Sequence, residues 1–206
     1  ENKLVKIPDE ISDEVAACIM LKGITAEYLL HRTYAVKKGD RILYHAAAGG
    51  LGQILCQWAN ALGCEVIGTV STKEKEKIAK ENGCHHVINY KEKNFAEEIK
   101  KKFGENSIDV VYDGVGASTF EGSVEVLKVR GMMVSFGNAS GPVKSIDVKK
   151  HIAVKGLFFT RPSVMHYTMK REELLDASHR VFEAIKSKKI KINISKKYKL
   201  DEAQKV

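Results

Sequence analysis

The sequence of 206 residues has no apolar run that approaches the ~18 residues a membrane-spanning helix needs. Its first residues, Glu1-Asn2-Lys3, match neither a secretory leader nor a transit peptide. Internal repeats and low-complexity linkers are missing as well. With 44% hydrophobic and 29% charged residues, the composition is that of an ordinary soluble globular protein rather than a disordered chain. These features predict a folded protein of the cytoplasm that makes no contact with membranes.

The sequence also lacks the spacing of cysteines that a structural zinc site or a redox motif needs. Its four cysteines contain no C-x-x-C pair, and they are Cys18, Cys56, Cys64 and Cys84. Two of them fall on or beside apolar helical or strand positions, which favours buried thiols over zinc ligands and disulfides. The neighbouring His85 and His86 stand at the entrance of a strand, where a structural role is more common than metal binding. We therefore predict no metal site.

Positive charge is in excess, with 34 lysines and arginines against 26 acidic residues and a net charge of +8. Such an excess can attract nucleic acid, a membrane surface or a phosphorylated ligand. The lysines are spread through amphipathic helices rather than gathered with aromatic residues. This distribution favours a solvated surface over a nucleic-acid site, although an RNA-binding module stays open as an alternative.

The stretch Arg41–Lys75 has the pattern of a strand, a helix and a second strand. Ile42–Tyr44 is a short apolar run between charged and small residues, as in a buried parallel strand. Apolar residues then recur at the spacing of one helix face from Leu51 to Leu62, and Gly63 stands where a helix commonly ends. A strand over Glu65–Val70 completes a βαβ unit.

Small residues fill the turn between this first strand and the helix. Ala47, Gly49 and Gly52 occupy the three positions of a G-x-G-x-x-G pattern, with alanine in place of the first glycine. In that pattern the small residues allow a tight turn, close approach of a pyrophosphate, and close packing of helix on sheet. A tight turn without a ligand is the alternative. Because the pattern sits in a βαβ unit, we predict that a dinucleotide binds there, its pyrophosphate on the free N–H groups of the helix.

The remaining chain keeps alternating between strands and helices. The further strands that we expect are Val87–Ile88, Ile108–Tyr112, Met132–Phe136 and Lys155–Phe159. The further helices begin at a cap formed by Ser71 or Thr72, at Asn94, and at a capping box in Ser118–Glu121. This alternation predicts an α/β fold, a doubly wound parallel sheet of six strands, the Rossmann fold. A helix over Glu172–Ile185 is expected to cover the end of the sheet.

Two short helices are expected before the sheet. Ser12 can cap a helix that extends to Met20, and a second helix covers Thr25–Arg32. Leu21–Ala26 between them favours a corner between helices, although its hydroxyl could instead face a ligand. We therefore divide the chain into a helical lead-in at 1–34 and a dinucleotide-binding domain at 35–206.

Glycines follow the later strands at the edge where a ligand lies in such sheets. They occur in Asp113-Gly114-Val115-Gly116 and in Gly137–Pro142. Turns alone would explain them, but their coincidence on one sheet edge favours a cofactor. Asp113 is predicted to stabilise a turn, and His45 to be a hydrogen-bonded core residue. No catalytic acid, base or nucleophile is predicted.

Together these motifs resemble the quinone oxidoreductase branch of the medium-chain dehydrogenase/reductase superfamily, the zeta-crystallin-like enzymes. The resemblance covers nearly the whole chain, and the stretches that carry it are Met20–Ala26, His45–Gly52, Val111–Gly116, Ser135–Gly141 and Thr160-Arg161-Pro162.

The resemblance implies roles for particular residues. Those that it places around the pyrophosphate and the adenosine are Gly49, Gly50, Leu51, Gly52, Ser71, Lys75, Tyr90, Val115 and Gly116. Those that it places along the nicotinamide half are Thr25, Phe136, Gly137, Asn138, Phe158, Phe159 and Thr160. It also implies a homodimer that joins through the cofactor domains, and no catalytic zinc.

In this family a GroES-like catalytic domain precedes the region and forms the other wall of the quinone pocket. We therefore expect the chain to be the cofactor domain of a larger enzyme, with residues 1–34 leading in from that catalytic domain. The implied reaction is hydride or stepwise electron transfer from NADPH to a quinone, the chemistry being carried by the cofactor. Alternatives are an enoyl or alkenal reductase of the same superfamily, and a nucleotide- or RNA-binding module without catalysis.

The residues themselves favour NADPH over NADH. NAD-binding domains carry an Asp or Glu about 20 residues beyond the glycines, whereas this chain has Val70-Ser71-Thr72 there. A 2′-phosphate would meet no acid at that place. Lys75, one turn into the next helix, can offer it an ammonium group, and Ser71 can offer a hydroxyl. The alternative is that Lys75 belongs to a solvated helix face.

Overall fold

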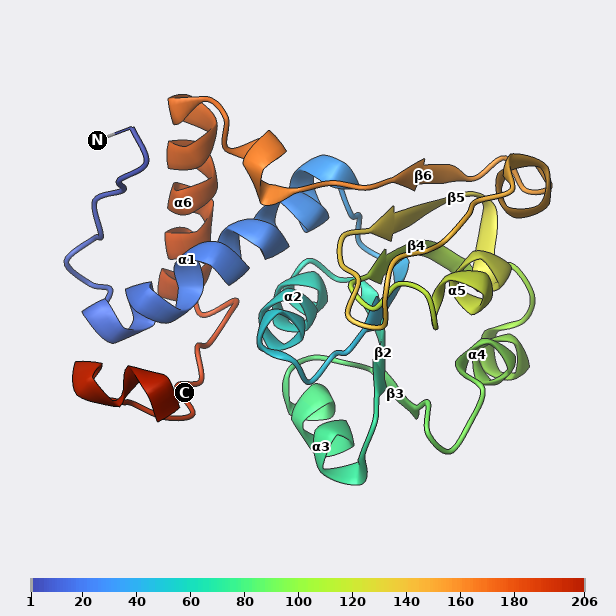
Figure 1. The fold of residues 1–206 in the computed structure, drawn as a ribbon, viewed down its shortest axis with the longest axis horizontal. Helices are drawn as coiled ribbons and strands as arrows, with labels where there is room; N and C mark the ends of the chain where they lie inside the picture. The colour runs from blue at the N-terminus through green and yellow to red at the C-terminus, as the bar shows by residue number, and fades with distance from the viewer. Residues whose placement is uncertain (1, 206) are drawn as a thin grey trace.

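The computed structural model describes residues 2–205 and contains a six-stranded parallel sheet. Its strand order is β3-β2-β1-β4-β5-β6, in which the chain moves outward from β1 in both directions (Figure 1). The strands are β1 (Arg41–His45), β2 (Glu65–Val70), β3 (His86–Asn89), β4 (Ile108–Asp113), β5 (Leu127–Ser135) and β6 (Phe158–Thr160). The prediction of a doubly wound parallel sheet is confirmed.

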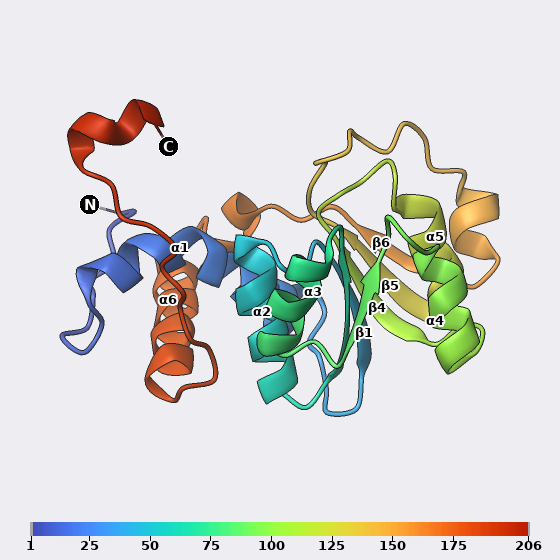
Figure 2. The same ribbon diagram turned by 90° about the horizontal axis from the view of Figure 1, so that it is seen from below.

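Helices cover both faces of the sheet. Figure 2 shows α2 and α3 on one side and α4 and α5 on the other. The bounds of these helices are α2 (Gly50–Ala61), α3 (Lys73–Glu81), α4 (Phe95–Phe103) and α5 (Phe120–Val126). Tyr44 and Tyr112 belong to the core beneath α2, whereas Leu43 and Val111 belong to the core beneath α4 and α5. Successive strand residues point to opposite faces, so each strand contributes to both cores.

Three of the predicted helix caps are confirmed. The side chains of Ser12, Thr72 and Asn94 each accept a hydrogen bond from the backbone of the helix that follows. The capping box in Ser118–Glu121 is wrong, because the N-cap of the helix is Thr119 rather than Ser118, and the Thr119 side chain makes no cap hydrogen bond. Its hydroxyl instead donates to the buried carboxylate of Asp113, over 2.7 Å. A buried charge without such donors would cost more than an uncapped exposed helix end.

The corner predicted within Leu21–Ala26 is also wrong. A single helix, α1, extends from Asp13 to Tyr28 and continues into a π-helical turn, η1 (Leu29–Thr33). A Cβ at Gly23 would lie 2.8 Å from Val181 of α6 and 2.9 Å from Ile19. Gly23 therefore lets α6 approach α1 closely, and it does not break the helix.

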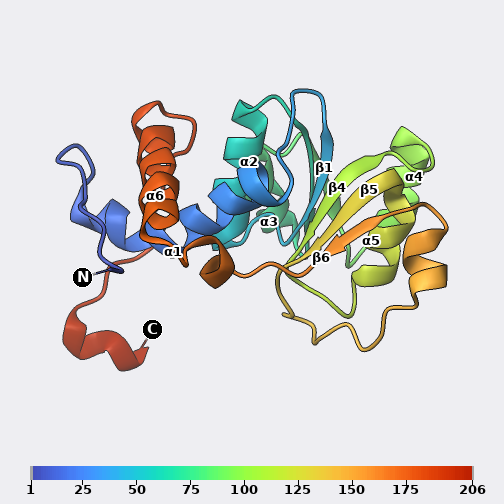
Figure 3. The ribbon, with the colours of Figure 1, turned by 90° about the horizontal axis from the view of Figure 1, so that it is seen from above.

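Helix α6 (Arg171–Lys186) does not cover the end of the sheet as expected, because it packs on α1 (Figure 3). A buried carboxylate joins the two helices. The carboxylate of Glu27 in α1 is fully buried, and it lies 2.8 Å from Arg32 and 3.4 Å from Arg180 of α6. Burial raises the pKa of Glu27, and the Arg32 guanidinium opposes that rise. The arginines thus supply the partners that a buried carboxylate needs.

The last strand is shorter than predicted at its start, because Lys155 lies before it. The Lys155 ammonium donates to the carbonyl oxygens of Val124, Glu125 and Leu127, where α5 ends. The neighbouring β5 begins earlier than predicted, at Leu127. Short helical segments complete the chain: η2 (Val148–Ala153), η3 (Val164–Tyr167) and η4 (Leu200–Lys205). Among the described residues, no helix is long and apolar enough to span a bilayer.

His45, at the end of β1, is a hydrogen-bonded core residue, as predicted. Its Nδ1 lies 2.9 Å from the Thr69 hydroxyl and its Nε2 lies 2.9 Å from the Ser123 hydroxyl. Burial lowers the pKa of His45 to about 4, and the charge of Asp113 opposes this shift. Because the charged imidazolium would lose its hydration, the folded protein holds His45 neutral.

We predict that His45 makes the folded state sensitive to acid. The unfolded chain binds a proton at His45 with an ordinary pKa of about 6.5, whereas the folded chain does so only near pH 4. Between these values the unfolded state binds more protons, so the free energy of unfolding falls as the pH falls. Protonation of His45 should lower the free energy of unfolding by about 2.5 kcal/mol between pH 7.5 and pH 4.5.

Urea unfolding of the wild type and of His45→Gln at both pH values measures the contribution of His45 to this loss of stability. Glutamine can bond both hydroxyls and does not titrate. The variant should therefore gain stability relative to the wild type as the pH falls. A difference between the two proteins that stays constant with pH would contradict the prediction.

Candidate cofactor-binding site

The turn from β1 into α2 leaves no room for a side chain at Gly52. A Cβ at Gly52 would lie 2.5 Å from the carbonyl oxygen of Ala47 and 2.7 Å from that of Ala46. Ala46 itself has a φ of 61°, and its carbonyl accepts from the Gly49 N–H over 2.9 Å. The helix thus begins against the strand end, which is the close packing that the glycine pattern predicts.

Alanine at the first position of the pattern is accommodated by the neighbouring strand. A Cβ at Gly68 of β2 would lie 2.6 Å from the Ala47 methyl group. The methyl group therefore occupies the space that a side chain on β2 would need. The departure from glycine at position 47 is compensated by a glycine at position 68.

The N-terminus of α2 carries no negative charge of its own. Its cap residue, Gly49, has no side chain to accept from the first N–H groups, and its first turn contains no acid. These free N–H groups, together with the helix dipole, favour an anion. Lys22 of α1 also approaches, since a Cβ at Gly50 would lie 2.8 Å from the Lys22 Nζ. The residues present fit the pyrophosphate of a dinucleotide.

Ser71 and Lys75 come together after β2. The Lys75 Nζ donates to the Ser71 hydroxyl over 3.2 Å, and the Thr72 cap fixes the start of the helix between them. In the part of the chain that the structure describes, no carboxylate lies within ion-pair distance of Lys75, whereas Lys77 lies 3.9 Å from Glu81. Lys75 is thus available to a phosphate.

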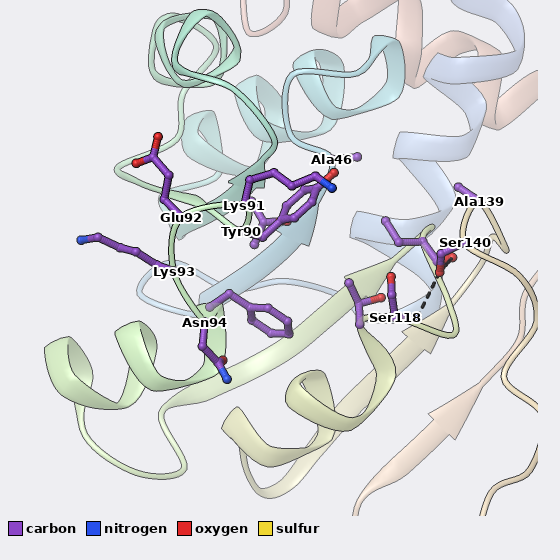
Figure 4. A pocket seen from close by; sticks show the side chains of 13 residues that line it. Ala46, Tyr90, Lys91, Glu92, Lys93, Asn94, Ser118, Ala139 and Ser140 are labelled. Atoms are coloured by element: carbon purple, nitrogen blue, oxygen red, sulfur yellow. Dashed lines mark hydrogen bonds between the residues drawn. The ribbon is translucent and has the colours of Figure 1, made fainter.

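A cavity of about 870 Å³ opens at the carboxyl ends of the strands (Figure 4). Tyr90 lines it from the segment after β3, and Val115 lines it from the loop after β4. Ser118 and Ser140 close the opposite side, where the Ser118 N–H donates to the Ser140 hydroxyl over 3.0 Å. Two of the residues expected around the adenosine, Tyr90 and Val115, therefore face the same space.

Two glycines expected beside the cofactor have a structural explanation. A Cβ at Gly116, whose φ is 95°, would lie 2.5 Å from the Gly141 carbonyl oxygen. A Cβ at Gly137 would lie 2.4 Å from the Gly114 carbonyl oxygen. These glycines let the loops after β4 and β5 pack on each other. The same packing holds Asn138, whose carbonyl accepts from Gly141 over 2.9 Å.

A second cavity, of about 650 Å³, lies between α1, α2 and the segment after β6. Thr25, Leu51 and Phe136, which the resemblance placed along the nicotinamide half and the pyrophosphate, all line it. Lys22 and Arg161 line it too. The Thr25 hydroxyl donates to the Leu21 carbonyl over 2.8 Å, so it bonds within α1.

The three residues of β6 line neither of these two cavities. Phe158 is 57% exposed, and Phe159 packs toward α5, with its ring 6.2 Å from that of Phe120. Thr160 pairs with Val134 of β5. The structure therefore does not bring Phe158, Phe159 and Thr160 together with Thr25 and Phe136 in one cavity.

Asp113 stabilises a turn, as predicted. Its buried carboxylate accepts from the backbone N–H groups of Val115 and Gly116, over 2.7 and 2.9 Å. His85 accepts from the Val66 N–H, and His86 lies 2.9 Å from Glu65, so both have structural partners. Within residues 2–205, no group of three His, Cys, Asp or Glu could hold a metal ion.

Sequence reasoning missed the cations that line the cavities. Lys22, Lys91, Lys93 and Arg161 all do so. Lys22 and Arg161 lie inside motifs that were noticed only for their glycine, threonine or proline. Lys91 directly follows Tyr90, and that adjacency was the one available signal.

Comparison with known proteins adds the family. A family model described as zinc-binding dehydrogenase matches residues 50–184. A 2-haloacrylate reductase from Burkholderia sp. is 46% identical over 204 residues, which are 98% of this chain and 61% of that protein. A quinone oxidoreductase from Salmonella typhimurium is 45% identical over 205 residues, 98% of this chain and 63% of that protein.

A solved structure of Escherichia coli quinone oxidoreductase complexed with NADPH is 45% identical, with a TM-score of 0.90, and the match covers 94% of this chain and 60% of that one. This chain thus spans about three fifths of the length of the curated relatives. Although the family's description implies zinc, the described residues offer no cluster of ligands that fits it. The sequence match and the fold place the chain in the zinc-binding dehydrogenase family, as a relative of the quinone oxidoreductases.

Proposed function

We propose that this chain is the NADPH-binding part of an oxidoreductase that reduces quinones. The observation that carries the proposal is the turn into α2, where Gly52 leaves no room for a Cβ and the first N–H groups of the helix are free. The quinone oxidoreductase relatives, one of them complexed with NADPH, support the choice of cofactor and acceptor.

When bound, NADPH supplies the hydride or electrons. The chain's own residues bind and orient it. The N–H groups at the start of α2 would donate to the pyrophosphate oxygens, and the Ser71–Lys75 pair would hold the 2′-phosphate. Thr25, Leu51 and Phe136 shape the 650 Å³ cavity in which the nicotinamide half would lie against a largely apolar wall. That wall excludes water from one side of the reacting ring.

One prediction separates cofactor binding from turnover. The purified 206-residue chain should bind NADPH, yet it should reduce a benzoquinone far more slowly than a full-length family member that contains this chain. Half of the acceptor pocket is expected to come from the preceding domain, so this chain alone neither orients a quinone nor excludes water fully. NADPH oxidation at 340 nm, with and without 1,4-benzoquinone, measures it. Equal rates for both proteins would contradict the prediction.

A second candidate function is reduction of an activated carbon–carbon double bond. The observation that favours it is the 46% identical relative named 2-haloacrylate reductase. A turnover panel on the full-length protein, with quinones and conjugated enones as acceptors, separates the two functions.

For the RNA-binding alternative, RNA should stay bound to this chain at low salt and dissociate steeply as salt rises.

The next prediction concerns Lys75 as selector of the cofactor. If its ammonium makes one charged hydrogen bond of ~2 kcal/mol to the 2′-phosphate, Lys75→Ala should weaken NADPH binding on the order of 30-fold. NADH binding should be nearly unchanged. Lys77→Ala is the matched control, since Lys77 lies on the same helix and pairs with Glu81. Fluorescence titration of both cofactors measures it, and an equal loss for NADPH and NADH would mean that Lys75 is not the selector.

The chain is also predicted to form a homodimer. β6 is an edge strand of the sheet, and its Phe158 is 57% exposed, so a second copy could pair with it and cover the side chain. Phe158→Lys should shift the protein toward monomer. Sedimentation velocity at rising concentration tests this, and a wild type that stays monomeric at high micromolar concentration would refute the dimer.

The division of the chain at residue 34, the cytoplasmic location, the absence of a membrane partner and the preference for a solvated surface over a nucleic-acid site stay predictions. The packing favours a less sharp division than the one expected from the sequence. Ile19 of α1 and Leu29 of η1 belong to the same apolar cluster as Tyr44 of the sheet.

A further inference from the structure

The segment after β3 is a turn that one buried side chain holds in place. Asn89 is only 6% exposed, and its Oδ1 accepts from the Lys91 N–H over 3.1 Å. Its Nδ2 donates to the Glu92 carboxylate over 3.2 Å. Its carbonyl accepts from the N–H groups of Glu92 and Lys93, both over 3.1 Å. The backbone of this turn is therefore fixed.

The three charged side chains of this turn, Lys91, Glu92 and Lys93, have different surroundings. Glu92 is held by Asn89, and Lys93 pairs with Glu98 of α4 over 3.1 Å. Lys91 is left: in the part of the chain that the structure describes, no carboxylate lies within ion-pair distance of its ammonium. In Figure 4, Lys91 lies along Tyr90 and reaches toward Ala46, whereas Glu92 and Lys93 point elsewhere.

The position of Lys91 suits the same phosphate that Lys75 serves. The Tyr90 N–H donates to the Val70 carbonyl over 3.0 Å, so Tyr90 stands beside the start of the Ser71–Lys75 pair. The Lys91 Nζ lies 5.9 Å from the centre of the Tyr90 ring, at the wall of the 870 Å³ cavity. A cation held over an aromatic face at the wall of a cavity is placed to meet an anion that enters it.

We propose that Lys91 is a second cationic contact for the adenosine 2′-phosphate, and that Asn89 positions it. This inference rests on the proposed function, because it requires NADPH in the cavity. Lys75 approaches the phosphate from α3 and Lys91 approaches it from the turn after β3. Two ammonium groups on different elements make the site select a phosphate monoester over a hydroxyl more strongly than one can.

The test compares Lys91→Gln with Lys93→Gln in the 206-residue chain. Both residues are exposed lysines on one turn, so both changes remove one positive charge and neither disturbs the core. Lys91→Gln should weaken NADPH binding about tenfold and change NADH binding less than twofold. Lys93→Gln should leave both affinities within twofold. In the wild type, the preference for NADPH should shrink as salt rises, and in Lys91→Gln it should shrink less.

Other outcomes overturn the proposal. An equal loss of affinity for NADPH and NADH in Lys91→Gln would mean that Lys91 supports the adenine or the fold. An equal loss of NADPH affinity in Lys93→Gln and Lys91→Gln would mean that a diffuse positive field, and not a contact of Lys91, attracts the phosphate. If the wild type prefers NADPH and Lys91→Gln keeps the whole preference, this inference fails while the proposed function stands. A wild type without any preference for NADPH would instead overturn the cofactor choice in the proposed function, and this inference with it.

Discussion

The structure depends on the contact between the first turn of α2 and the end of β1. Gly52 approaches the carbonyl oxygens of Ala46 and Ala47 so closely that no Cβ fits, and the Ala47 methyl group fills the space left by Gly68 in β2. The first contact fixes the start of α2 against the end of β1, and the second fixes the turn before α2 against β2. They aim its free N–H groups at the sheet edge where the loops after β2, β3 and β4 converge, so the cavity and the Ser71–Lys75 pair are placed relative to that helix.

Most of the fold could be predicted because its signals are local. The apolar run of β1, the periodic face of α2 and the caps Ser12, Thr72 and Asn94 depend on residues within a few positions of each other. The errors fell on residues whose partners lie far away in the sequence. Leu21–Ala26 has the pattern of a corner between helices, but its Gly23 lies against Val181 of α6. Ser118–Glu121 has the pattern of a capping box, but the Thr119 hydroxyl donates to Asp113. Lys155 was expected in a strand, but its ammonium donates to carbonyl oxygens at the end of α5. In each case a tertiary contact outweighed a local preference.

In the candidate site too, local features were predictable and contacts between distant segments were not. Ser71 and Lys75 lie four residues apart on one helix start, so their meeting was predictable from spacing. The roles of Gly116 and Gly137 were not, because the backbone that each of them contacts belongs to another segment. Lys91 escaped notice for a similar reason: only the buried Asn89, with its hold on Glu92, shows which of the charged side chains in that turn is left for a ligand.

We expect a dinucleotide to bind with its pyrophosphate on the N-terminus of α2. Titration of the isotope-labelled chain with NADPH, followed by the amide resonances of Gly49, Gly50 and Gly52, tests it most directly. These amide resonances should shift in a saturable way, with the same dissociation constant as the resonances of Ser71 and Lys75. NADPH binding that leaves the three glycine amides unmoved and perturbs another surface would contradict it.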